Sequence, residues 1–138
     1  MIVQDFTLPA YLWRVRVYYA VHGYWTDEIL ADLRAIGCRG THLENARASL
    51  ERHELDTGLT YSDFEGRRTV MVISRASSAS EFLNSWIHEM LHLCRHVCRA
   101  FGIDPYGEEA AYLSGDVGQK MFKVAKRFVC DCCRGKMG

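Results

Sequence analysis

The segment from Ser78 to Gly102 constrains the fold of this chain more than any other, because it carries both end signals of a helix. Ser78 followed by Glu81 is a capping box, and Gly102 is a typical residue just past a helix end. Between these ends, apolar side chains recur at helical spacing: Leu83, Trp86, Ile87, Met90, Leu91, Cys94, Val97, Cys98 and Phe101. The pattern predicts a largely buried helix that runs from Ser78 to about Phe101.

The residues before this helix predict one strand, two helices and a hairpin. Residues 12–21 alternate apolar and basic side chains, which is typical of a strand with one buried face. Helical spacing then predicts a helix from Thr26 to Gly37 and a more polar helix over residues 41–55. Residues 58–75 predict two strands around a turn at residues 65–66.

A last helix is predicted from Gly107 to about Cys130. The order strand, two helices, hairpin, two helices predicts an α+β fold, with the helices packed on one side of a small antiparallel sheet. With 138 residues the chain has the size of one domain. We divide that domain, residues 1–138, into residues 12–75, a helix pair over residues 78–130 and a cysteine-containing tail over residues 131–138.

Charge and hydropathy exclude some partners. The 17 lysines and arginines balance 17 aspartates and glutamates, so no net field attracts nucleic acid. Basic residues gather on the last helix, but a solvated helix face explains them, and we expect no nucleic-acid partner. No apolar run reaches the roughly 18 residues of a membrane span, and the N-terminal stretch lacks the features of a secretory signal. We therefore expect a cytoplasmic protein without membrane contact; the sequence predicts no oligomeric state.

Six cysteines are present, and in a reducing compartment we expect thiols rather than disulfides. Cys94 and Cys98 are one helical turn apart, which favours a role in core packing. The other cluster, Cys130, Cys132 and Cys133, does not match the paired spacing of a structural zinc site. We assign no role to that tail.

Three residues inside the predicted helix carry the clearest chemistry: His88, Glu89 and His92. The two histidines are four residues apart and therefore lie on one side of the helix. Their ring nitrogens can converge on one ion at about 2.0–2.1 Å, the distance that zinc prefers. Glu89 can then reach water at the metal and act as general base. The competing interpretation is a buried helix whose histidines are satisfied by hydrogen bonds in the core.

A catalytic zinc site needs a third protein ligand. His96 continues the row, but it lies about 12 Å from His88 along the helix, too far to share one ion. Glu108 and Glu109, which open the last helix, are better candidates, although acidic residues at a helix N-terminus are also explained by the helix dipole. Glu108 is in line with the residues that we take as the inward face of that helix: Tyr112, Gly115, Phe122 and Val129. We favour Glu108 and keep Glu109 as the alternative.

The stretches HEMLH and GEEAAYLSG together resemble a minimal gluzincin, a zinc metallopeptidase with two histidines and a downstream glutamate. From Gly66 to Phe122 the chain is also similar to small proteins encoded by bacteriophages and mobile elements of gut bacteria. The resemblance implies a zincin-like fold with bound Zn²⁺ and a peptide or protein substrate. In this class a strand before the active helix pairs with the substrate, here residues 69–74, and Tyr112 is the nearest candidate to stabilise the oxyanion.

Two functions remain open at this point. The first is a zinc-dependent metallopeptidase that hydrolyses peptide bonds with metal-activated water. The second is a structural or binding protein of a phage or mobile element that keeps the zincin fold without turnover. An intact Glu89 favours the first, since a structural zinc needs no base. The short loop over residues 102–106 favours the second, because it leaves little room for substrate pockets.

Overall fold

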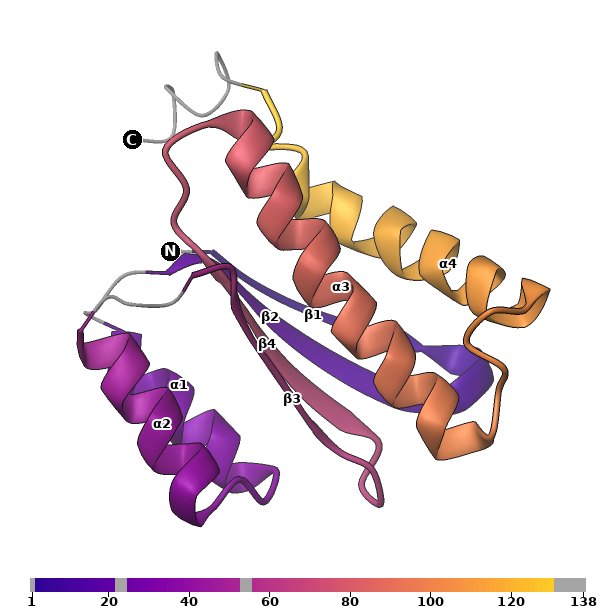
Figure 1. The fold of residues 1–138 in the computed structure, drawn as a ribbon, viewed down its shortest axis with the longest axis horizontal. Helices are drawn as coiled ribbons and strands as arrows, with labels where there is room; N and C mark the ends of the chain where they lie inside the picture. The colour runs from indigo at the N-terminus through magenta and orange to yellow at the C-terminus, as the bar shows by residue number, and fades with distance from the viewer. Residues whose placement is uncertain (1, 22–24, 53–55, 131–138) are drawn as a thin grey trace.

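The computed structural model describes residues 2–21, 25–52 and 56–130, which form a sheet between two pairs of helices (Figure 1). The strands are β1 (Ile2–Leu8), β2 (Trp13–Val21), β3 (Gly58–Asp63) and β4 (Arg68–Ser74). The helices are α1 (Thr26–Ala35), α2 (Gly40–Glu51), α3 (Ala79–Phe101) and α4 (Glu108–Ala125). The α+β class predicted from the sequence is confirmed.

The sheet has the strand order β1-β2-β4-β3 and is mixed. The β1–β2 and β3–β4 pairs are antiparallel hairpins, whereas β2 and β4 run parallel with Val17 opposite Met71. The prediction of an antiparallel sheet is therefore wrong, because the two hairpins join through strands that run in the same direction. Strand β1 was not predicted.

Helices cover both faces of the sheet, so the prediction that they pack on one side is also wrong. On one face α3 and α4 pack against alternate residues of β2 and against Met71 and Ile73 of β4. On the other face α1 and α2 pack against Tyr18, Val70 and Val72. The two central strands have apolar residues on both faces, which is why each face needs a covering layer.

Helix α3 begins and ends where the sequence predicts. The Ser78 hydroxyl accepts a hydrogen bond of 3.2 Å from the Glu81 backbone N–H, and Gly102 adopts a left-handed φ of 64°. The expectation of a largely buried helix is wrong on one side. The exposed fractions of Leu83, Ile87 and Leu91 are 42%, 51% and 44%. The sheet and α4 therefore cover only the inner part of the apolar surface.

The other helices begin within one residue of the predicted positions but end earlier. Helix α4 ends at Ala125 rather than near Cys130. Helix α2 ends at Glu51, with Arg52 as its C-cap, and residues 53–55 of its predicted range lie outside the described residues, as do Cys132 and Cys133. No helix in residues 2–21, 25–52 and 56–130 has both the length and the apolar character needed to cross a membrane.

Candidate metal and catalytic site on helix α3

The imidazole rings of His88 and His92 face each other on the exposed surface of α3. Their Nε2 atoms are 3.3 Å apart, and the ring centroids are 5.0 Å apart. A tetrahedral ion bound by two nitrogens at 2.0–2.1 Å would hold those nitrogens about 3.3–3.4 Å apart. A hydrogen bond between the two rings is the alternative, but 3.3 Å is long for one. The spacing of the two nitrogens therefore fits a shared metal ion.

Glu89 lies beneath this pair and is almost completely buried, with 2% of its surface exposed. Its Oε1 atom accepts a hydrogen bond of 2.8 Å from the Thr60 hydroxyl, and its Oε2 atom accepts one of 2.7 Å from the Thr57 hydroxyl. The same Oε2 atom is 3.9 Å from His88 Nε2. This distance exceeds the separation expected for two ligands of one tetrahedral ion and suits a carboxylate that meets water beside the metal.

Gly58 lets strand β3 approach α3 closely enough for these hydrogen bonds. Its φ is +147°, a conformation that side chains rarely adopt. A Cβ atom at this position would lie 1.8 Å from the Val72 carbonyl oxygen and 3.2 Å from Glu89 Cγ. Only glycine therefore fits at position 58.

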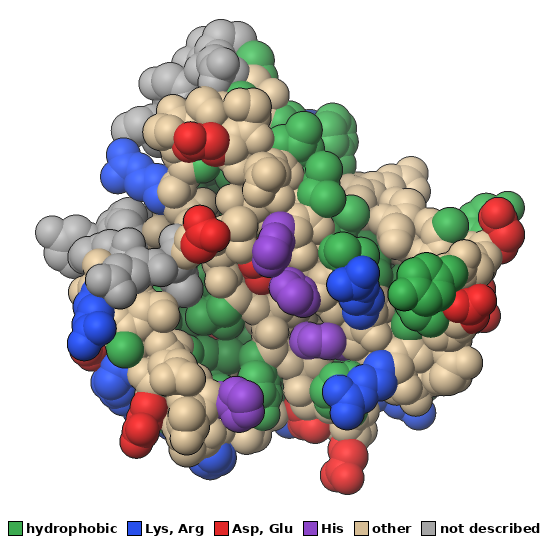
Figure 2. Space-filling model, in the orientation of Figure 1, with side chains coloured by type: hydrophobic (Ala, Val, Ile, Leu, Met, Phe, Trp, Pro, Cys, Tyr) green, Lys and Arg blue, Asp and Glu red, His purple; other side chains and the backbone are tan. Residues whose placement is uncertain are grey.

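His96 extends the pair into a row of three histidines on α3, His88, His92 and His96, which we call the histidine row (Figure 2). Its Nδ1 atom is 2.7 Å from the Ser62 hydroxyl, which is 2.7 Å from the Thr69 hydroxyl. Burial, together with the nearby His92 and Arg99, lowers the pKa of His96. The ring is thus held by the sheet and stays away from the facing nitrogens of the other two histidines.

Sequence reasoning missed the strand residues that support the site: Thr57, Thr60 and Ser62 of the β3 region. A signal for them was present. Polar Thr60 and Ser62 alternate with Leu59 and Tyr61, so one face of this strand is polar and can hydrogen-bond a polar partner. That partner is Glu89 and His96 of α3, which share the helix side that faces β3.

Helix α4 packs on the side of α3 that is opposite to the histidine row. A Cβ atom on Gly118 would lie 3.6 Å from Met90 Sδ, and the Ser114 side chain lies beside the Cys94 thiol. Met90 and His92 are two residues apart and therefore project about 160° from each other around the helix. Helix α4 consequently contacts α3 on the side away from the histidine row.

The structure does not bring Glu108, Glu109 or Tyr112 to the histidines. Extending the antiparallel contacts of α4 places Glu108 level with residue 100 of α3, about 12 Å along the axis from His92. Glu109 instead accepts a hydrogen bond of 3.2 Å from the Tyr11 hydroxyl. Tyr112 has 74% of its surface exposed. The third-ligand assignment from the sequence thus has no support in the geometry.

The predicted inward face of α4, on which the choice of Glu108 rested, was wrong. The residues of α4 that are buried are Ala110, Leu113, Val117, Met121 and Ala125. Phe122, which the sequence analysis placed inside, has 51% of its surface exposed. Both faces of the helix contain apolar residues, and only tertiary contacts decide between them.

Two further observations concern the metal ligands and the strand edge that the site could provide. Within the described residues, no group of three or more His, Cys, Asp and Glu side chains is arranged to hold a metal ion. The strand expected to receive a peptide, residues 69–74, lies in β4 between β2 and β3 and has no free edge. The edge strand beside the histidine row is β3.

Comparisons of the chain with protein-family models, with curated proteins and with solved structures found no match.

Proposed function

We propose that this protein is a zinc-dependent hydrolase that cleaves peptide bonds, with His88 and His92 as metal ligands and Glu89 as general base. The observation that carries the proposal is the 3.3 Å separation of the two Nε2 atoms above a buried carboxylate. A purely structural zinc would need no base beside it. Among the described residues the site supplies two protein ligands, one fewer than a catalytic zinc site ordinarily has, and water and substrate would take the remaining positions.

When bound, Zn²⁺ would polarise the scissile carbonyl and lower the pKa of water at the site. Glu89 Oε2 takes the proton of the attacking water and delivers it to the leaving nitrogen. The hydroxyls of Thr57 and Thr60 hold the carboxylate in the orientation needed for both transfers. Burial of the Glu89 side chain between α3 and β3 also keeps bulk solvent away from the carboxylate.

The surroundings of the site support an extended peptide as substrate. Strand β3 is an edge strand whose outer side is available for main-chain hydrogen bonds. The exposed side chains of Ile87 and Leu91 lie on the same helix as the histidines, one residue before His88 and His92. They offer an apolar surface to a substrate side chain next to the scissile bond. A helix with two zinc ligands beside an edge strand is the arrangement that we would call zincin-like.

Cleavage of a mixed peptide library by zinc-loaded protein tests the proposal. We expect wild type to cleave, and Glu89→Gln to retain zinc but lose at least about 100-fold in kcat/KM, as for removal of a general base. Glu44→Gln, which removes an exposed carboxylate on α2, is the matched control and should cleave like wild type. Equal activity in Glu89→Gln and wild type would rule out the catalytic role of Glu89.

The second function is a binding protein that holds zinc without turnover. The specific observation in its favour is that the described residues supply no third protein ligand. In that case wild type would bind zinc through His88 and His92, and no peptide in the library would be cleaved. The two functions therefore differ in turnover and not in metal content.

A further inference from the structure

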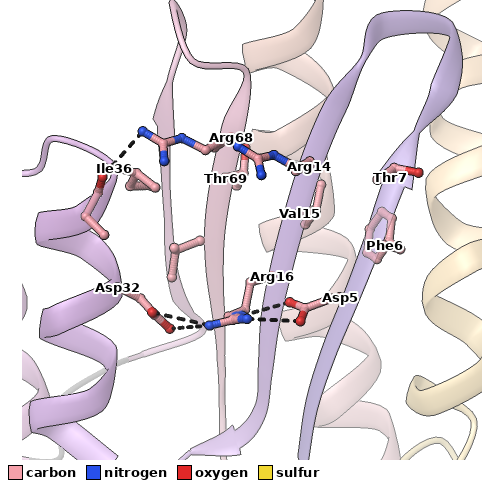
Figure 3. Close-up of a pocket in the computed structure, with 12 residues that line it drawn as sticks. Asp5, Phe6, Thr7, Arg14, Val15, Arg16, Asp32, Ile36, Arg68 and Thr69 are labelled. Atoms are coloured by element: carbon pink, nitrogen blue, oxygen red, sulfur yellow. Dashed lines mark hydrogen bonds and ion pairs between the residues drawn. The ribbon is translucent and has the colours of Figure 1, made fainter.

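A separate pocket of about 600 Å³ lies on the opposite face of the sheet from the histidine row (Figure 3). Its floor is formed by β1, β2 and β4, and α1 borders it on one side. Thr7, Arg14 and Arg68 are register partners across these three strands and share this face. We call this site the arginine pocket and define it by Arg14, Arg16 and Arg68.

The carboxylates of the arginine pocket are both committed to Arg16. Asp5 binds its guanidinium through two contacts of 2.8 and 3.0 Å, and Asp32 approaches it from α1 at 3.3 Å. The pocket lining contains three arginines and two aspartates, and Arg68 pairs with a third aspartate, Asp63, outside the lining, so Arg14 is the one of the three arginines without a carboxylate partner among the described residues. Neither aspartate is bonded to Arg14.

Arg14 and Arg68 retain unused donors. Arg68 donates through Nη2 to Asp63 at 3.1 Å and to the Ala35 carbonyl at 3.4 Å, which leaves its Nη1 group without a partner among the described residues. The Arg14 guanidinium has no hydrogen bond or ion pair to any described residue. Figure 3 shows both side chains extending across the sheet toward α1. Like charges on directly paired strand positions repel each other, and an anion bound beside them would reduce that repulsion.

We propose that the arginine pocket binds a small organic oxyanion, a phosphate monoester or a carboxylate, through Arg14 and Arg68. Guanidinium groups present paired donors that match both kinds of oxyanion. The apolar part of the ligand would contact Ile36 and Val70, which also line the pocket. The volume falls in the range of small-molecule sites, roughly 300–1,000 Å³. The proposal does not depend on the hydrolase function, since the two sites lie on opposite faces of the sheet.

Amide NMR of the ¹⁵N-labelled full chain tests this site, with phenyl phosphate and benzoate as probes at constant ionic strength. We expect saturable shifts at the amides of Thr7, Arg14 and Val70 and at the Arg14 side-chain N–H. The probe that binds more tightly identifies the phosphoryl or the carboxylate group as the natural anion. Arg14→Gln should weaken binding at least about tenfold, because a charge-assisted hydrogen bond is lost.

Arg47→Gln is the matched control, since Arg47 lies on α2 and pairs with Glu51 at 3.6 Å. It removes the same charge outside the pocket and should bind the probes like wild type. Arg14 is exposed, so its substitution should leave the amide spectrum unchanged away from the pocket. Absence of saturable shifts with both probes would overturn the proposal. Equal affinities in Arg14→Gln and wild type would overturn it as well.

Discussion

The hydroxyl of Thr60 on the edge strand donates a hydrogen bond of 2.8 Å to the buried Oε1 atom of Glu89 on helix α3. This contact joins the sheet to the helix at the point where the proposed base must be oriented. It also means that the stability of the fold and the chemistry of the site depend on the same side chains. The first prediction follows from that dependence.

Thr60→Val removes the hydroxyl and keeps the shape of the side chain. We expect the free energy of unfolding to fall by about 1–3 kcal/mol, because Glu89 Oε1 loses its partner while remaining buried. Urea unfolding monitored by circular dichroism measures the change. Thr41→Val on the exposed surface of α2 is the control and should stay within about 0.5 kcal/mol of wild type. A Thr60→Val protein as stable as wild type would show that the hydrogen bond contributes nothing.

Gly58→Ala should be among the most destabilising single substitutions in this chain. The added Cβ atom would overlap the Val72 carbonyl at 1.8 Å in a backbone conformation that favours glycine. We expect a loss of at least about 3 kcal/mol or failure to fold, as for other strained core substitutions.

Gly115→Ala should have the opposite effect on stability to Gly58→Ala. Gly115 lies inside α4, and a Cβ atom there meets nothing within 4 Å. Because alanine is the better helix former, we expect a gain of about 0.5–1 kcal/mol. Thermal unfolding of both variants measures the contrast, and a stable Gly58→Ala protein would contradict the close approach of Gly58 to the Val72 carbonyl of β4.

Asp63 should make stability depend on pH in the acid range. A backbone hydrogen bond from Gly66 at 3.1 Å, then the Arg68 guanidinium, lowers the pKa of Asp63 below its ordinary value of 3.8. The unfolded chain therefore binds the proton first, so this contribution is complete above the ordinary pKa and is lost as pH falls through the lowered one. Asp63→Asn should flatten the fall in unfolding free energy in that window. An acid limb identical to that of wild type in Asp63→Asn would contradict this assignment, and Glu44→Gln is the control.

Variants of the two glutamates of α4 distinguish the geometry described here from the ligand set that the gluzincin resemblance implies. The resemblance implies that Glu108 or Glu109 is a zinc ligand and that Tyr112 is catalytic. The structure places α4 behind α3, so we expect Glu108→Ala and Glu109→Ala to keep the zinc content of wild type. Tyr112→Phe should likewise retain kcat/KM. Loss of zinc in either alanine variant would show that α4 reaches the histidines and would contradict the helix packing described here.

Local features of the fold could be predicted from the sequence because they depend on neighbouring residues. The Ser78–Glu81 cap, the αL glycine at Gly102 and the β3–β4 hairpin all follow from short-range chemistry. The meeting of His88 and His92 also follows from helix geometry alone, since four residues make about one turn.

Features that depend on distant residues were missed. Strand β1 is recognised only through its pairing with β2, and the parallel β2–β4 pairing joins segments separated by two helices. The orientation of α4 could not be read from its sequence, because Phe122 and Met121 are equally apolar and only packing buries Met121. The choice of Glu108 as third ligand rested on that same orientation, and the alanine variants of Glu108 and Glu109 test it.

Zinc content of the purified protein, reconstituted with Zn²⁺ and dialysed, tests the central claim most directly. We expect one zinc per chain in wild type and in His42→Ala, whose histidine lies on α2 beside Tyr61. His92→Ala should bind none, because it removes one of the two facing nitrogens. Wild type without zinc, or His92→Ala with the zinc content of wild type, would contradict the claim that this pair is a metal site.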